Sequence, residues 1–352
     1  MLYNLLRPLL FQLEPETAHS LSFTLATLAQ RCGVLPNWAR HTPEHPCNAF
    51  GLHFKNPVGL AAGLDKDAAH IAALTRFGFG FIEVGTVTPR PQPGNPKPRL
   101  FRLPEHQAII NRMGFNNGGL ETMLPRLAQA RNSPNTQASA LLGVNIGKNK
   151  DTALADANSD YLRCLHAVAP FADYITINIS SPNTPGLREL QHGDARQQLL
   201  GALHEARQAL TEQLQRPLPL LLKIAPDLSE QDIVDIAHDL QQFAIDGVIA
   251  TNTTNDRSAV ADHRHGQESG GLSGAPLATA SSAVITQLRA TMGPHYPIVG
   301  VGGIVSGEDA VAKVAAGATM VQLYSGLIYR GPELVQEVAT AVSQYITNQR
   351  GQ

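Results

Sequence analysis

A strand-then-helix rhythm is the feature that most constrains how this 352-residue chain can fold, and it begins near residue 57. Short apolar runs end in polar or glycine-rich turns, and each is followed by a stretch with helical periodicity. Runs that are apolar on both faces are typical of a parallel sheet covered by helices. Eight such runs occupy residues 58–63, 80–86, 141–147, 174–180, 220–226, 247–253, 298–304 and 320–326.

The segments between these runs have helical signals, of which residues 229–244 give the clearest example. Ser229 is a natural N-cap, and Asp232 lies in the first turn that follows it. The apolar stripe of this helix is expected to be Ile233, Ile236, Ala237 and Leu240. Eight strand–helix units predict an α/β fold of the (β/α)8 barrel (TIM barrel) type, which typically needs about 250 residues. An open doubly wound sheet would normally use fewer strands.

Two stretches exceed what a barrel needs. Residues 1–40 precede the first run and predict a small helical extension, which leaves residues 41–352 for the barrel. A long insertion is expected at about residues 87–139, and its first part is rich in proline, charge and asparagine. Long loops inside compact domains are usually functional or disordered, and the apolar residues of "IINRMGF" favour a functional loop.

Composition excludes several classes of function. The formal net charge of −2 and the absence of a basic patch argue against nucleic acid as a partner. Cys32, Cys47 and Cys164 lack CxxC spacing, which indicates a reducing compartment and no metal site. No run of eighteen apolar residues exists to span a membrane, and the N-terminus lacks the pattern of a signal peptide.

Polar side chains collect where the predicted strands end. A barrel places its active site at the carboxyl ends of its strands, so these residues are expected to lie together. In strand order they are Lys66, Thr86, Asn145, Asn178 with Ser181 and Asn183, Lys223, Thr251 with Asn252 and Thr253, Gly302 with Gly303, and Tyr324 with Ser325.

Lys223 is the sharpest of these signals because it is flanked by apolar residues in "LLLKIAP". It either extends to water from a strand end or points into the barrel mouth as the partner of an anionic ligand. Lys66 in "LDKD" has the same two interpretations, as a solvated turn residue or as a site cation. Asparagines at three strand ends indicate a pocket for a carboxylate or an imide ring, since an amide both donates and accepts hydrogen bonds.

The glycines of "GVGGIVSGEDA" precede a helix that Ser306 is expected to cap. Gly302 and Gly303 either close a tight turn or expose N–H groups to a phosphate at the helix N-terminus. The loops after the seventh and eighth strands are the common phosphate site of barrels, which favours the second interpretation. One phosphate, a cation and an amide cluster for a ring together predict flavin mononucleotide, FMN.

The chain also resembles a known family, the membrane-associated, quinone-dependent class of dihydroorotate dehydrogenases (class 2). The resemblance begins at "LFQLEPETAH" and continues almost to the end of the chain; the regions "HGDARQQ" and "DHRHGQES" depart from it. Ten motifs match in order: "GLAAGLDKD", "GTVTPRPQPGNPKPRLFRL", "INRMGFNN", "NIGKNK", "NISSPNTPGLR", "KIAPDL", "DGVIATNTT", "GGLSG", "GVGGI" and "YSG".

This resemblance implies oxidation of (S)-dihydroorotate to orotate in de novo pyrimidine (UMP) biosynthesis. Hydride would pass to one FMN per chain, and electrons would then pass to a membrane quinone. The implied flavin positions are Ala62, Gly63, Lys66, Thr86, Asn145, Asn178, Lys223, Thr251, Gly274, Gly303, Tyr324 and Ser325. The implied substrate positions are Lys66, Asn111, Arg112, Met113, Gly114, Phe115, Asn178, Asn183, Asn252 and Thr253.

Ser181 falls on the position of the catalytic base, where the soluble class has cysteine. It would remove the C5 proton of dihydroorotate while the C6 hydride passes to flavin N5. No histidine lies in this stretch, so a Ser–His triad is not visible. The proton would leave through water or a neighbouring hydroxyl such as that of Thr184.

The first 33 residues are apolar but interrupted by Pro8 and Pro15, which predicts two short amphipathic helices. These helices either pack under the barrel bottom or, as the resemblance implies, rest on the bilayer and admit quinone through a tunnel. Arg102 would be a quinone contact. The implied protein is a monomer, attached peripherally to the cytoplasmic side of the inner (cell) membrane.

Three other classes remain open from the residues alone. A class I aldolase-like lyase would also use a strand-end lysine, as a Schiff base. A non-catalytic phosphate-binding barrel would not need the strand-end amides, and a soluble flavin barrel would lack the N-terminal helices.

Overall fold

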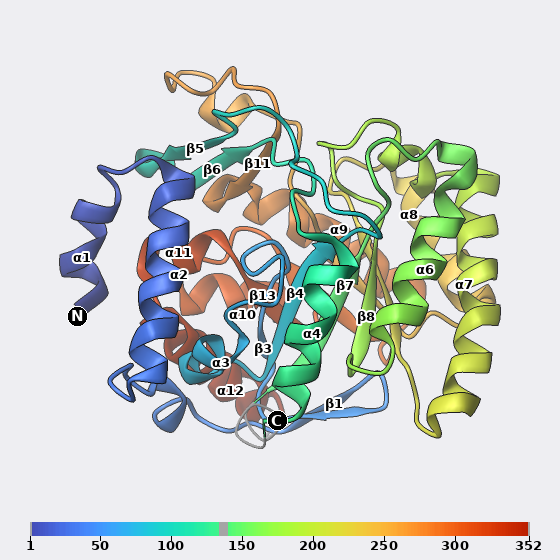
Figure 1. Ribbon diagram of the computed structural model, residues 1–352, viewed down its shortest axis with the longest axis horizontal. Coiled ribbons are helices and arrows are strands. Elements are labelled where there is room, and N and C mark those ends of the chain that lie inside the picture. The colour runs from blue at the N-terminus through green and yellow to red at the C-terminus, as the bar shows by residue number, and fades with distance from the viewer. Residues whose placement is uncertain (1, 134–139, 351–352) are drawn as a thin grey trace.

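A computed structural model describes residues 2–133 and 140–350 as a closed barrel of eight parallel strands with helices around it (Figure 1). The predicted (β/α)8 fold is therefore confirmed. Residues 134–139, which end the expected insertion, lie outside the described residues, as do Met1 and residues 351–352. The strands neighbour one another in the order β10, β12, β13, β3, β4, β7, β8 and β9, and the last pairs with the first.

Each of the eight apolar runs contributes one barrel strand. These strands are β3 (Val58–Leu60), β4 (Phe81–Val87), β7 (Leu141–Ile146), β8 (Tyr174–Asn178), β9 (Leu220–Ile224), β10 (Gly247–Ala250), β12 (Ile298–Val301) and β13 (Met320–Leu323). The remaining strands are β1 (Cys47–Ala49), β2 (Leu52–Phe54), β5 (Leu100–Leu103), β6 (Ala108–Asn111) and β11 (Gly271–Gly274). The helices are α1 (Leu2–Leu10), α2 (Pro15–Arg31), α3 (Ile71–Leu74), α4 (Gly119–Arg131), α6 (Ala157–Val168), α7 (Gly193–Leu214), α8 (Glu230–Gln242), α9 (Ala278–Met292), α10 (Gly307–Ala315), α11 (Ser325–Arg330) and α12 (Glu333–Arg350).

The predicted caps and stripe of the barrel helices are confirmed where the sequence was clearest. Ser229 accepts a hydrogen bond from Asp232 N and forms a capping box with that residue at the start of α8. Ser306 caps α10 by accepting a hydrogen bond from Asp309 N. The expected stripe of α8 is buried: Ile233, Ile236, Ala237 and Leu240.

The interior of the barrel is apolar at the amino ends of the strands. Large side chains fill this end and form one cluster: Phe81, Tyr174, Leu221, Ile249, Val299 and Met320. Glycine on the neighbouring strands makes room for two of them, since a Cβ at Gly59 or Gly143 would lie within 2.2 Å of the Phe81 or Tyr174 ring. The hairpin β1–β2 covers this end with Phe50 and Phe54, so the N-terminal helices are not needed there.

A three-stranded antiparallel sheet lies over the opposite end of the barrel, where the strands have their carboxyl ends (Figure 1). Strands β5 and β6 come from the long insertion. The third strand, β11, comes from the segment after β10 and pairs Gly271 with Asn111. Sequence analysis did not predict β11. The later part of residues 87–139 forms α4, which packs against β4 and α6 as a barrel helix does.

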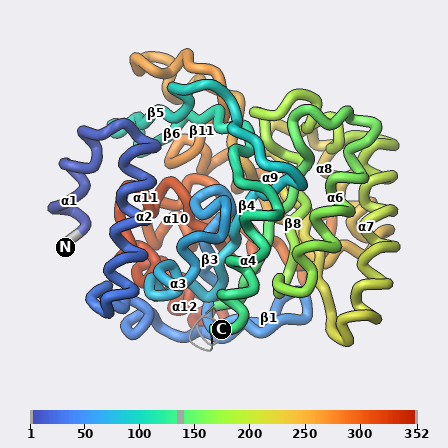
Figure 2. Tube along the Cα trace, viewed as in Figure 1, coloured from blue at the N-terminus to red at the C-terminus, as the bar shows by residue number. Residues whose placement is uncertain are grey.

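Helices α1 and α2 stand at one side of the barrel, with α2 beside α3 and β5 (Figure 2). Pro15 opens α2, and the Glu14 side chain caps it by accepting from two backbone N–H groups. Pro8, however, lies inside α1 and does not interrupt it. The two short helices that the sequence predicts are confirmed, although the break between them comes after Leu10 and not at Pro8. Tyr3 OH and Arg7 Nη1, which both precede Pro8, donate to carbonyls of α11 and hold α1 against that helix.

Candidate active site

The carboxyl ends of the barrel strands surround a cavity, and most of the predicted site residues line it. Those that do are Ala62, Gly63, Lys66, Thr86, Asn111, Met113, Gly114, Phe115, Asn178, Ser181, Asn183, Lys223, Thr251, Asn252, Thr253, Gly274, Gly303, Tyr324 and Ser325. Segments as distant as residues 61 and 326 therefore meet, as a barrel requires of its strand ends.

Two predicted residues do not line the cavity. Asn145 lies one layer deeper, where its Oδ1 accepts from Thr86 Oγ1 at 2.5 Å and from Asn178 Nδ2 at 3.1 Å. It therefore supports two lining residues. Arg112 turns outward to pair with Glu268 at 2.7 Å, with its guanidinium 4.8 Å from the centre of the Phe101 ring.

The cavity wall is positively charged. Among the described residues, its lining includes Lys66 and Lys223 and no Asp, Glu or His. Two ammonium groups without a lining carboxylate favour an anionic ligand, because burying unpaired charge of one sign is costly. The charge pattern thus selects against a cationic substrate.

Lys223 projects inward from β9 and is only 5% exposed. Its ammonium has no hydrogen-bond partner among the described residues. Burial lowers the pKa of Lys223, and the negative charge of Glu83 below it partly opposes that shift. The interpretation of Lys223 as a side chain that extends to water is therefore wrong, and a bound anion would supply a counter-charge that the described residues of the lining lack.

Lys66 lies in the loop after β3 and donates to Asn116 Oδ1 at 2.6 Å. Burial lowers its pKa to about 8, and the nearby charge of Arg99 acts in the same direction. The place of Lys66 in the cavity lining favours its interpretation as a site cation over that of a solvated turn residue. Near neutral pH it is still a cation, and an anionic ligand beside it would raise its pKa again.

Ser181 follows β8 and is 6% exposed, facing the cavity. Its Oγ accepts from Asn183 N at 3.2 Å, which fixes the hydroxyl oxygen without using its proton. Asn183 in turn donates through Nδ2 to Asn111 O at 3.1 Å. This bond joins the serine loop, the segment after β8 that contains Ser181 and Asn183, to the "NRMGF" loop. The hydroxyl of Thr184 is buried and has no partner among the described residues.

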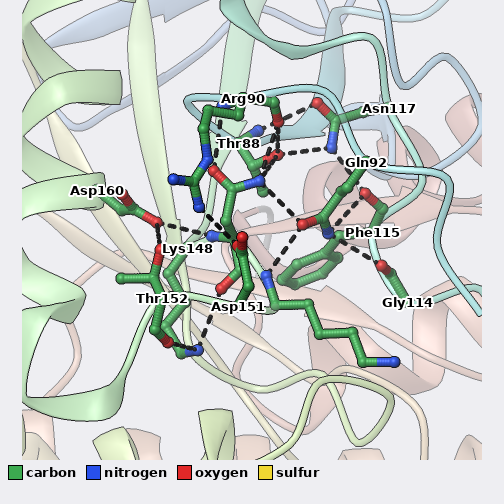
Figure 3. A network of polar contacts seen from close by, with 12 residues as sticks. Thr88, Arg90, Gln92, Gly114, Phe115, Asn117, Lys148, Asp151, Thr152 and Asp160 are labelled. Carbon is green, nitrogen blue, oxygen red and sulfur yellow. Dashed lines mark hydrogen bonds and ion pairs between the residues drawn. The ribbon is translucent and has the colours of Figure 1, made fainter.

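A network of polar contacts holds the "NRMGF" loop in place (Figure 3). Gln92 Nε2 donates to the carbonyls of Gly114 and Phe115, both at 3.1 Å. Gln92 Oε1 accepts from Asn149 Nδ2 at 2.9 Å, and Asn149 is 1% exposed. Asn117 adds a bond from Nδ2 to Phe115 O at 2.7 Å. Side-chain amides thus connect one wall of the cavity to the loops after β4 and β7.

Asn95 extends this support to the serine loop. Its Nδ2 donates to Arg112 O at 2.9 Å and to Asn183 O at 3.2 Å. Sequence analysis assigned no role to Gln92, Asn95 or Asn149. The only signal for them was polar residues inside the proline-rich insertion and just after the third strand run.

Glycines shape the opposite wall. Gly303 has φ +81°, and a Cβ there would lie 2.4 Å from Ala278 Cα, so no side chain fits. The start of α10 contributes less than expected, because Gly307 N and Asp309 N already donate to the Glu337 carboxylate and to Ser306 Oγ. The glycine turns themselves, rather than the helix N-terminus, are therefore the surface offered to an anion.

A second cavity, of about 400 Å³, lies between α2 and the loop after β3. Glu16, His19, Ser20 and Thr24 of α2 line it. It shares four lining residues with the first cavity: Gly63, Lys66, Met113 and Tyr324. The two cavities therefore adjoin across these side chains, and burial lowers the pKa of His19 to about 4, which keeps its ring neutral.

The fold and this site define a class: a (β/α)8 barrel with a cavity at its mouth that two lysines line, beside a second cavity under an N-terminal helix. The sequence profile of the dihydroorotate dehydrogenase family matches residues 46–346. The chain belongs to the dihydroorotate dehydrogenase family.

Relatives and solved structures agree with this assignment. The chain is similar to the "Dihydroorotate dehydrogenase (quinone)" of Marinobacter nauticus, at 54% identity over 98% of this chain and 100% of the relative. It is also similar to that of Chromobacterium violaceum, at 56% identity over 98% and 99%. A crystal structure of DHODH from Eimeria tenella in complex with ferulenol superimposes with a TM-score of 0.87 at 39% identity, over 96% of this chain and 92% of that one.

Proposed function

We propose that this chain oxidises (S)-dihydroorotate to orotate with FMN as the hydride acceptor and quinone as the final electron acceptor. The reaction is a step of pyrimidine biosynthesis. The observation that carries this proposal is the cavity itself, where Ser181 and strand-end asparagines face two lysines and no carboxylate among the described residues. That set matches a substrate which bears a carboxylate and ring amides.

The residues present fit FMN. Thr253 Oγ1 and Gln322 Oε1 are buried without a partner among the described residues, and both side chains line the cavity. Such atoms indicate a polar ligand, because an unpaired buried oxygen costs free energy. The glycine turns, with Gly274, Gly303 and Ser325 of the lining, would hold the phosphate, and Lys223 would face the ring.

When bound, FMN supplies a ring that accepts a hydride from the substrate and later passes electrons to quinone. Lys66 would hold the substrate carboxylate, and Asn111, Asn183 and Asn252 would hold its ring amides. Fixing the substrate this way brings its C5 proton to Ser181 and fixes the face from which the hydride leaves.

Ser181 would then remove the C5 proton. Its Oγ is held by Asn183 N, so the oxygen keeps one position while its proton stays free to move. A serine hydroxyl alone is a weak base, so the proton must pass on to another group. Thr184 would be that group, because its buried hydroxyl has no hydrogen-bond partner among the described residues. Arg112 pairs with Glu268 and would affect substrate binding only by holding the "NRMGF" loop in position.

Quinone would reach the site through the second cavity, which adjoins the first at Tyr324 and Gly63. Every exposed large hydrophobic side chain among the described residues lies between residues 5 and 34: Leu5, Leu6, Leu9, Leu13, Leu21, Leu25, Leu28 and Val34. This concentration supports peripheral association of residues 1–40 with a bilayer, at the cytoplasmic face of the cell membrane. Residues 41–352 would form the catalytic unit of a monomer.

None of the helices in residues 2–133 and 140–350 is long and apolar enough to cross a membrane. Arg102 donates to the carbonyls of Leu10, Phe11 and Leu13, at the corner between α1 and α2. Arg102 would therefore affect quinone binding by holding α1 and α2 in position.

The visible spectrum of the purified protein tests the proposal. We expect a flavin spectrum that dihydroorotate bleaches and a quinone restores. A colourless protein that borohydride traps with a carbonyl substrate would instead support a lyase that uses Lys223 as a Schiff base. A flavin spectrum unaffected by dihydroorotate would overturn the proposed substrate.

A further inference from the structure

A buried carboxylate lies beneath the site and has no role in the chemistry described above. Glu83 projects inward from β4 and is 0% exposed. Four neutral donors from three other barrel strands converge on it: Asn145 Nδ2 at 2.8 Å, Gln322 Nε2 at 2.9 Å, Thr176 Oγ1 at 3.1 Å and Tyr174 OH at 3.2 Å. A carboxylate that only accepts suits this arrangement, because all four neighbours donate.

The acceptor-only character of Glu83 dictates how Asn145 is oriented. The Asn145 amide must turn its NH2 group down to Glu83, and its Oδ1 therefore points up toward the cavity. There Oδ1 accepts from Thr86 Oγ1 and from Asn178 Nδ2. The orientation of a deep amide thus determines which groups of Thr86 and Asn178 remain for a ligand.

The same donor-to-acceptor direction continues through the residues proposed to bind the substrate. Asn178 Oδ1 accepts from Ser180 Oγ at 3.0 Å, and Ser180 Oγ accepts from Asn252 Nδ2 at 2.9 Å. Asn252 Oδ1 then accepts from Thr253 N at 2.8 Å. Every hydrogen bond in this chain is donated in the direction from Thr253 toward Glu83. Reversing the Asn145 amide would therefore place its NH2 group against the NH2 group of Asn178.

Gln322 on β13 is oriented by the same carboxylate. Its Nε2 donates to Glu83, which leaves its Oε1 as an acceptor without a partner among the described residues. Gln322 lines the cavity. Glu83 therefore determines that Gln322 presents a carbonyl oxygen, rather than an NH2 group, to a bound ring.

We propose that Glu83 is a positioning residue that sets the direction of the amide chain Asn145–Asn178–Asn252 and of Gln322, and with it the hydrogen-bond pattern offered to FMN and orotate. This inference rests on the proposed function. The negative charge of Glu83 also raises the pKa of buried Lys223, so Glu83 helps to keep this lining residue charged as well.

Glu83→Gln tests the proposal, because it keeps the size of the side chain and adds an NH2 group among four donors. Apo-protein is titrated with FMN by flavin fluorescence, and the holoprotein is then titrated with orotate by the flavin absorbance change. We expect both dissociation constants to rise roughly tenfold to a hundredfold, the usual effect of leaving a buried hydrogen-bonding group unpaired.

Asp239→Asn is the matched control for general damage. Asp239 is 3% exposed and accepts from Arg196 and Gln197 in the helical layer, and it does not line the cavity. We expect this control to lower the melting temperature and leave both dissociation constants unchanged. Ser180→Ala removes the link between Asn178 and Asn252 but keeps the bond from Ser180 N to Asn178 Oδ1, so it should weaken orotate binding several-fold and FMN binding less.

Three results would overturn the proposal. One is Glu83→Gln protein that folds and binds FMN and orotate as the wild type does. Another is a loss of affinity no larger than that of Asp239→Asn. If Glu83→Gln does not fold, Gln322→Met replaces it: this variant removes the Oε1 that Glu83 orients toward the cavity and leaves three donors on Glu83, and wild-type affinities in it would make Glu83 a folding residue only. Wild-type protein that binds neither ligand would overturn the proposed function as well.

Discussion

Membrane attachment can be predicted quantitatively from the outer face of α2. Leu21, Leu25 and Leu28 form a stripe at helical spacing, and Leu25 and Leu28 are 52% and 55% exposed. Full burial of a leucine side chain stabilises by about 1.5–3 kcal/mol, so burying the exposed half in lipid contributes about 1 kcal/mol for each. The double variant Leu25→Ser with Leu28→Ser should therefore bind membranes roughly 30-fold more weakly.

Sedimentation with vesicles of phosphatidylcholine and phosphatidylglycerol measures this change. Gln241→Ser with Gln242→Ser provides the control, since both residues are exposed on α8, on the other side of the barrel (Figure 1). Turnover with a small soluble acceptor should stay at the wild-type rate, because neither leucine lines a cavity. Vesicle binding at full strength in the leucine variant would refute the assignment of α2 as the membrane face.

Ser181→Ala should retain FMN yet slow flavin reduction by roughly 10²–10⁴-fold in stopped flow, since general base catalysis is worth that much; normal rates at every pH would remove Ser181 as the base. Lys223→Met should retain FMN less tightly in dialysis, because the buried site loses its cation; unchanged retention and turnover would show that the ammonium is not needed. Orotate affinity should fall as pH rises through about 8, where the Lys66 ammonium, its pKa lowered by burial, loses its proton. Titrations from about pH 6 to about pH 9.5 measure this, and Lys66→Met should bind weakly throughout. Gln92→Ala should raise KM for dihydroorotate several-fold, because it removes the hydrogen bonds that Gln92 donates to the carbonyls of Gly114 and Phe115. The control Gln208→Ala, at an exposed residue, should leave KM unchanged.

Local sequence determined the elements and many of the site residues. The eight apolar runs became barrel strands because period and flanking turns are properties of neighbouring residues. Ser229 and Ser306 cap helices for the same reason, since a cap needs only the three residues that follow it. Lys66, Ser181 and Lys223 line one cavity because a barrel always brings its strand ends together.

Tertiary structure decided whatever depends on residues far apart in the chain. Strand β11 has only four residues and exists because Gly271–Gly274 pairs with Asn111–Ala108, some 160 positions earlier by the numbering. Arg112 sits inside a predicted substrate motif, yet Glu268 and Phe101 draw it outward. Neither partner is visible from the motif itself.

Glu83 shows the difference most clearly. In "FIEVGT" it is one acid in an apolar run, and nothing nearby in the sequence indicates whether it faces helices or the barrel interior. Closure of the barrel brings Asn145, Thr176 and Gln322 from three other strands onto its two oxygens. The sequence alone therefore identified most of the side chains that reach the mouth. The orientation of their donors and acceptors depends on a buried charge whose partners only the closed barrel brings together.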